Sequence, residues 1–274
     1  MPLITSQMPE DWGELEDLVT AILNEAGLQA RRAVLVVLPR GSVNVDVVAE
    51  ETYDGITHRI FCECKNWRTN VPQDVVHAFR TVVGEAGANR GYVVSRIGFQ
   101  TGAIEAARST NIELVTFAEF QEIYFAKWYN KQLWDIEHEI ENFNVYYEPI
   151  GKPGYSHLKN DAERAAYDEV WHKYLFAGII LMLFSPNSRL IRENAPDVPP
   201  LPLDVAKLEE QGVSVPEDIK GVTAYREFFA ILTEYARNGL RELRAVNPIT
   251  RGKAPDEIPR DDDFFSTHDP THKP

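Results

Sequence analysis

The N-terminal part of the chain alternates between apolar patterns typical of helices and apolar patterns typical of strands. Residues 11–26 carry apolar side chains at helical spacing, and Gly27 stands where such a helix would end. Residues 33–38 are a β-branched run followed by a Pro-Arg-Gly-Ser turn. Valines occupy alternate positions in residues 43–48, which predicts a second strand.

The same kind of pattern continues through residue 116. Residues 50–57 contain Asp54-Gly55 and predict a hairpin loop, after which residues 58–65 return as a third strand. Two helices and two short strands are then predicted, the helices at 72–86 and 99–109 and the strands at 91–95 and 112–115. The order predicts an α/β domain with an αβββαβ core, in which helices flank a mixed sheet.

Strand patterns stop after Phe117, and helical ones take over. No Gly or Pro interrupts residues 103–148, so we expect a long helix that continues towards Phe143. Two more helices are predicted at 161–184 and 223–246, separated by a proline-rich linker. The tail is rich in Pro and Asp. The expected division is an α/β domain at 1–124, a helical domain at 125–246 and a disordered tail at 247–274.

Composition narrows the class of protein. The chain has 274 residues, 44% of them hydrophobic and 26% charged, which is typical of a soluble globular protein. No run is apolar for long enough to cross a bilayer, no secretory signal is evident and two cysteines are too few for a disulfide framework. These features predict a cytoplasmic protein with no membrane segment. The net charge of -14 argues against a non-specific nucleic-acid coat, yet leaves room for an enzyme with one locally basic groove.

Three charged residues on successive predicted strands form the strongest candidate site. Asp46 lies on the second strand, and Glu63 and Lys65 share one face of the third. Two carboxylates and the backbone carbonyl of Cys64 are oxygen ligands of the kind that Mg²⁺ prefers, and an ammonium beside them can orient water or stabilise negative charge. The alternative is a cross-strand salt bridge at the surface, which would contribute little to stability.

Two further residues are weaker candidates. Glu16 lies at the edge of the apolar stripe of the first helix, where a buried acid needs a partner, although a solvated position explains it equally well. Gln73 opens the helix after the third strand and could lie near the metal, or have no role beyond starting that helix. Cys62 and Cys64 lack a second cysteine pair, which favours core packing over a metal clip through sulfur.

Residues 11–123 resemble the catalytic domain of Mrr-type restriction endonucleases, a family of the PD-(D/E)xK nuclease superfamily. The matching stretches are WGELEDLV, VNVDVVAEE, FCECKNW, GYVVSRIGFQTGAIEAA and NIELVTF. The resemblance implies that Asp46, Glu63 and Lys65 are catalytic and that Glu16 is an accessory acid. The sequence departs from the family pattern in two ways. Ser42 to Val45 stand where the family commonly has glycines just before the first acid, and no separate DNA-binding domain is recognised.

The resemblance implies a restriction-endonuclease-like core followed by a helical domain. The expected function is metal-dependent hydrolysis of DNA phosphodiester bonds in defence against foreign DNA, with Mg²⁺ or Mn²⁺ as cofactor. Arg40 and Arg68 are the chosen candidates for phosphate contacts, out of a set that also contains Arg31, Arg32 and Arg96. The alternative is a catalytically silent binding or assembly module that recruits a protein partner through its helical domain. A homo-oligomer is compatible with either function.

Overall fold

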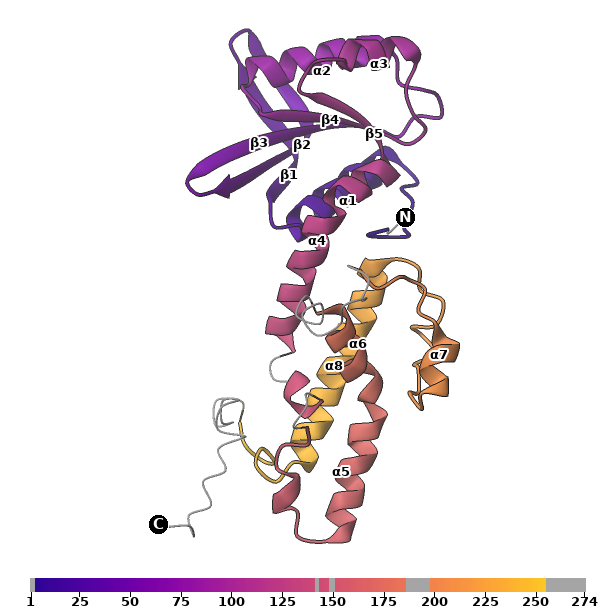
Figure 1. The fold of residues 1–274 in the computed structure, drawn as a ribbon. Helices are drawn as coiled ribbons and strands as arrows, with labels where there is room; N and C mark the ends of the chain where they lie inside the picture. The colour runs from indigo at the N-terminus through magenta and orange to yellow at the C-terminus, as the bar shows by residue number, and fades with distance from the viewer. Residues whose placement is uncertain (1–2, 141–142, 148–150, 186–197, 255–274) are drawn as a thin grey trace. The chain divides into compact units, whose positions relative to one another are not determined.

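The computed structural model describes residues 3–140, 143–147, 151–185 and 198–254, and the chain divides into two compact units, Met1–Gln132 and Leu133–Pro274 (Figure 1). The first unit holds a five-stranded sheet in the order β1-β2-β3-β4-β5. Its strands are β1 (Gln29–Leu38), β2 (Gly41–Tyr53), β3 (Ile56–Lys65), β4 (Arg90–Ser95) and β5 (Ile112–Thr116). The first three strands pair antiparallel and the last three parallel, so the sheet is mixed.

Helices cover both faces of this sheet. The helices are α1 (Trp12–Glu25), α2 (Gln73–Glu85), α3 (Thr101–Ala107) and α4 (Phe117–Glu139). Figure 1 shows α2 and α3 on one face and α1 with the first part of α4 on the other. The predicted fold class, a mixed sheet flanked by helices with further helices after it, is confirmed.

Helix α1 forms for the reasons that its sequence indicates. The Asp11 carboxylate accepts the N–H of Glu14 at 2.9 Å, which satisfies one of the free donors at the helix start. The helix ends before Gly27, whose φ of 91° is the left-handed conformation that favours glycine. Its apolar stripe is buried against β1, β2 and β3 through Leu15, Leu18, Val19, Ile22 and Leu23.

The strict alternation predicted for β2 is wrong at one position. Val45 and Val48 lie in the same core under α2, although they are three residues apart, so the alternation slips at Asp46. Opposite that residue on β1, Ala33 has a φ of 49° and forms no register pair, while Arg32 and Val34 on either side do. A non-glycine residue in this conformation costs about 1–3 kcal/mol. The flanking pairs hold this distortion beside the candidate site.

The second unit is helical. Its helices are α5 (Asp161–Lys173), α6 (Leu175–Phe184), α7 (Val205–Glu210) and α8 (Tyr225–Val246), with short 3-10 helices at Asn144–Tyr146 and Tyr155–His157. The single helix predicted at 161–184 is broken at Tyr174, which is buried and donates its hydroxyl to Glu242 of α8 at 2.7 Å. Helix α4 ends at Glu139, before the expected Phe143. Across the described residues, none of the helices has both the length and the apolar character that a membrane crossing requires.

The chain after α8 is ordered further than the sequence suggests. Asn247 and Thr250 are buried, and Asn247 donates to the hydroxyl of Tyr146 at 3.1 Å while accepting the N–H of Ile249 at 2.9 Å. The expectation of a disordered tail from residue 247 is therefore wrong for residues 247–254. Residues 255–274 lie outside the described part of the chain.

Asn247→Ala is expected to lower the free energy of unfolding by about 1–3 kcal/mol, because it removes a buried hydrogen bond to the Tyr146 hydroxyl and leaves the part-buried Ile249 N–H without its acceptor. Urea unfolding followed by circular dichroism measures the change. The matched control is Asn238→Ala on the surface of α8, where the amide contacts only exposed side chains and the effect should stay within about 0.5 kcal/mol. Equal effects of the two substitutions would show that the segment after α8 contributes nothing to stability.

Candidate active site

Asp46 lies where two strands of the sheet separate. Backbone pairing of β2 with β3 ends at Val47 and Cys62, whereas β3 continues to pair with β4 as far as Lys65. Beyond the last β2 pair, the Cys64 N–H has no strand partner, and Asp46 Oδ2 accepts it at 2.8 Å. The carboxylate therefore satisfies a backbone donor that the divergence of the strands would leave free.

Glu63 and Lys65 complete the cluster. The Lys65 Nζ lies 2.5 Å from Glu63 Oε1 and 3.9 Å from Asp46 Oδ2. The three side chains are 15–23% exposed, so they do not form the solvated surface salt bridge that the sequence left open. Burial raises the pKa of Glu63, and the nearby Asp46 raises it further, against the opposing effect of Lys65. The ammonium thus balances two carboxylates that repel one another.

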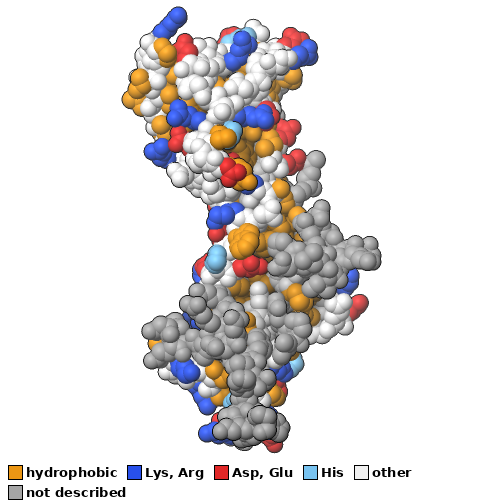
Figure 2. Space-filling model, turned by 60° about the vertical axis from the view of Figure 1, so that its left-hand side comes forward, with side chains coloured by type: hydrophobic (Ala, Val, Ile, Leu, Met, Phe, Trp, Pro, Cys, Tyr) orange, Lys and Arg blue, Asp and Glu red, His pale blue; other side chains and the backbone are white. Residues whose placement is uncertain are grey.

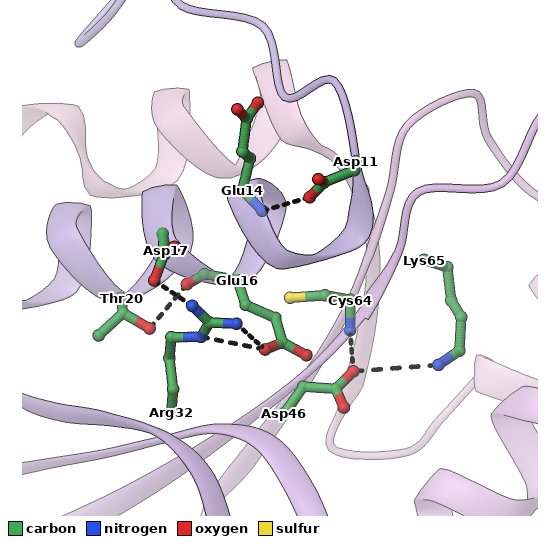
Figure 3. Close-up of polar contacts among 9 residues, drawn as sticks. All are labelled: Asp11, Glu14, Glu16, Asp17, Thr20, Arg32, Asp46, Cys64 and Lys65. Atoms are coloured by element: carbon green, nitrogen blue, oxygen red, sulfur yellow. Dashed lines mark hydrogen bonds and ion pairs between the residues drawn. The ribbon is translucent and has the colours of Figure 1, made fainter.

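Glu16 reaches this cluster from α1. It is 1% exposed, and its Oε2 accepts two hydrogen bonds from Arg32, at 3.1 Å from Nε and 2.9 Å from Nη2. Its Oε1 is buried without a hydrogen-bond partner, and Figure 3 shows this carboxylate between Arg32 and Asp46. Burial raises the pKa of Glu16, with a further contribution from Asp46. The side chain is therefore not solvated, and a buried carboxylate oxygen without a partner is costly.

The guanidinium of Arg32 is occupied within the protein. It binds Glu16 and also pairs with Asp17, as Figure 3 shows. Arg32 was one of five arginines that the sequence offered as phosphate contacts. Its place in the structure is instead that of a clamp that fixes one oxygen of Glu16 and leaves the other directed at Asp46.

The cluster offers hard oxygen donors to a cation. Asp46 and Glu63 supply carboxylates, and the Cys64 carbonyl points to the same side of β3 as its N–H, towards Asp46. No three His, Cys, Asp or Glu side chains gather into a ready metal cluster in the described residues. Two carboxylates with water and a substrate phosphate are nevertheless the arrangement in which Mg²⁺ is usually bound. The unpartnered Oε1 of Glu16 fits a cation or its water nearby.

The cysteine sulfurs have no part in such a site. Cys62 and Cys64 are fully buried and free, and burial raises the pKa of both thiols. A buried thiol in apolar surroundings stays protonated and is a poor metal ligand. Core packing, the interpretation favoured by the sequence, is confirmed by their burial.

Comparison with known families identifies the part of the chain that holds this cluster. Residues 8–124 match the Mrr catalytic-domain model, described as a restriction endonuclease. The N-terminal domain belongs to the Mrr-type restriction endonuclease family. This membership indicates a nuclease and implies DNA as its substrate, and nucleases of the PD-(D/E)xK type generally use divalent metals. The match ends before the helical unit.

Two other comparisons add little. A crystal structure of a protein of unknown function, AF1548, matches with 17% identity over 86% of this chain and 98% of its own, at a TM-score of 0.36. A score this low supports no argument. No curated protein matches the chain.

The restriction endonuclease domain does not bring every predicted residue to the cluster. Gln73 starts α2 as expected, but it is exposed and its side chain lies against Gly102 of α3. Arg40 is in the turn between β1 and β2, six positions from Asp46 along an extended strand, or about 20 Å. Arg68 is exposed in the loop after β3. Arg96 follows β4, and its N–H donates to the Lys65 carbonyl at 3.1 Å.

One feature of the domain was not anticipated from the sequence. A pocket of about 270 Å³ opens beside the cluster, and Glu63 and Lys65 belong to its lining together with Trp67. Trp67 is 41% exposed, and the Lys65 ammonium lies 5.8 Å from the centre of its ring. An aromatic residue two positions after the motif lysine was a possible signal, but sequence alone does not tell an exposed indole from a core one.

Proposed function

We propose that this chain is a metal-dependent endonuclease that hydrolyses DNA phosphodiester bonds in restriction of, or defence against, foreign DNA. The observation that carries the proposal is the convergence of Asp46, Glu63 and Lys65 where β2 and β3 separate. The Mrr-type family of residues 8–124 supports the same reaction class.

Asp46 and Glu63 would hold Mg²⁺ or Mn²⁺, together with the carbonyl of Cys64. A divalent cation at such a site polarises the phosphate and lowers the pKa of the attacking water. The Lys65 ammonium, held within hydrogen-bond distance of Glu63, orients that water and offsets the negative charge that develops on the phosphate. Glu16 faces Asp46 and adjusts the charge of the cluster, and Arg32 fixes its orientation.

Substrate DNA needs positive charge close to the cluster. Arg68 and Arg96 follow the carboxyl ends of β3 and β4, which meet at one edge of the sheet, so we assign the phosphate contacts nearest the site to them. Arg40, farther along the hairpin, would contact a flanking phosphate. Figure 2 shows Lys and Arg side chains scattered among other types on one face of the molecule, which supports local contacts over a broad basic surface.

A second candidate function is a catalytically silent binding module. Its support is that Lys65 already pairs with both carboxylates and that no ready metal cluster exists in the described residues. A plasmid-cleavage experiment separates the two functions.

Wild-type protein is expected to convert supercoiled plasmid to nicked and linear forms with Mg²⁺ or Mn²⁺, and to stop when EDTA is added. Agarose gel electrophoresis over a time course measures the rates. An RNA of similar length, run in parallel, tests the choice of DNA. Intact plasmid under every metal condition, with DNA binding retained, would favour the silent module.

A further inference from the structure

The pocket beside the cluster has apolar walls. Val43 and Val45 of β2 face Val75, Phe79 and Val82 of α2 across it. Val45 and Phe79 are core residues, at 1% and 3% exposure, so the pocket reaches down to the hydrophobic core. Such apolar walls offer water few hydrogen bonds, whereas a flat apolar group would bury apolar surface area against them.

The polar lining lies on the side of the proposed active site. Lys65 and Glu63 belong both to the pocket and to the cluster, and Asn44 of β2 also lines the pocket. Trp67 contributes an indole that is 41% exposed, and Arg68 follows it directly in the chain. An aromatic ring beside a cation is the combination that binds single-stranded nucleic acid, because the ring stacks on a base and the cation neutralises the backbone.

Size limits the occupant. A volume of about 270 Å³ falls just below the ~300–1,000 Å³ of pockets that take drug-sized ligands. One nucleobase, flat and largely apolar with a hydrogen-bonding edge, fits these apolar walls and the polar lining from Glu63 and Lys65. A base pair does not fit so small a space.

We propose that this pocket binds one unpaired nucleobase of the strand whose phosphate lies at Asp46, Glu63 and Lys65, with Trp67 stacking on the base. The inference rests on the proposed function and names its substrate class, DNA with an unpaired, mismatched or extruded nucleotide. Extruding a base from a fully paired duplex costs a few kcal/mol, and least where the base is already unpaired. Cleavage therefore concentrates at such nucleotides.

The test measures DNA binding under conditions in which no metal-dependent cleavage takes place. Fluorescein-labelled DNA duplexes that differ at one position are titrated with protein in EDTA: fully paired, carrying one unpaired base, or carrying an abasic residue at the same place. Wild type should bind the duplex with the unpaired base about tenfold tighter than the abasic one, the scale of one base stacked on an aromatic side chain. The abasic duplex has the same flexible backbone, so the difference reports the base itself.

Three variants at two positions test whether the base preference comes from this pocket. Trp67→Ala should abolish the difference between the two duplexes, and Trp67→Phe should keep most of it. Ala78→Phe fills the pocket from an exposed position of α2 and should also abolish the difference. The control is Trp134→Ala, which removes a 61% exposed indole from the last part of α4, beyond the end of the first unit at Gln132, and should change nothing.

Failure of this inference is distinct from failure of the proposed function. Equal affinities of wild type for the unpaired base and the abasic residue would overturn the pocket assignment, even if plasmid were cleaved. A base preference that Trp67→Ala leaves intact would overturn it as well. A base preference lost in Trp67→Ala would support the pocket in a protein that cleaves nothing, because the binding is measured in EDTA.

Discussion

Asp46→Asn is expected to slow metal-dependent plasmid cleavage by at least about a thousandfold, which corresponds to ~4 kcal/mol of lost transition-state stabilisation. The substitution removes the charge that would hold the cation but keeps an oxygen that can accept the Cys64 N–H. Asparagine is therefore a cleaner test than alanine, which would also leave a buried backbone donor without a partner. Cleavage rates at saturating Mg²⁺ and Mn²⁺, with a thermal melt of the same samples, provide the measurement.

Lys65→Ala is expected to cause a loss of similar size, because it removes the ammonium that contacts Glu63 and Asp46. Matched controls are Asp161→Asn, whose carboxylate is fully exposed at the start of α5, and Lys159→Ala, also exposed. Both should cleave at the wild-type rate. If Asp46→Asn or Lys65→Ala retains a rate within about tenfold of wild type while folded, the catalytic assignment is wrong.

The sequence predicts those parts of the fold that depend on local patterns. The spacing of apolar residues in α1, the Gly27 that ends it and the Asp54-Gly55 turn are each encoded within a few positions. The placement of Asp46 and Glu63 on neighbouring strands follows from the order of the predicted strands along the chain. The roles of these residues remain a proposal.

Long-range contacts account for what the sequence did not predict. The clamp of Arg32 on Glu16 joins residues 16 positions apart, and no local pattern distinguishes it from two surface charges. The left-handed Ala33 lies in a β-branched run that suits an ordinary strand, and it is the one position between the pairs of Arg32 and Val34 with β2 that forms no pair itself. The break at Tyr174 lies where its hydroxyl binds Glu242, 68 residues later, a contact that no local pattern shows.

The second large effect is expected in the thermal stability of the protein when a divalent metal is added. Mg²⁺ or Mn²⁺ should raise the melting temperature of the wild type, because a cation that binds only the native state stabilises it by about 2.7 kcal/mol at a hundredfold excess over its Kd. The cation would relieve repulsion among buried carboxylates. This repulsion is present without metal, because burial and the proximity of Asp46 raise the pKa of both Glu16 and Glu63. Without metal, Lys65 offsets this repulsion at Glu63 and Arg32 offsets it at Glu16.

Asp46→Asn should abolish most of this metal response. Its effect on metal-free stability is expected to be small, because the substitution removes repulsion with Glu63 and Glu16 but also removes an attraction to Lys65. The measurement is a thermal melt of wild type, Asp46→Asn and the control Asp161→Asn, in EDTA and with added Mn²⁺ at constant ionic strength. Asp161→Asn should respond as the wild type does, since an exposed carboxylate far along the chain has no part in the cluster. An equal metal response in Asp46→Asn and wild type would mean that Asp46 does not bind the cation, and the proposed reaction would lose the residue on which its chemistry depends.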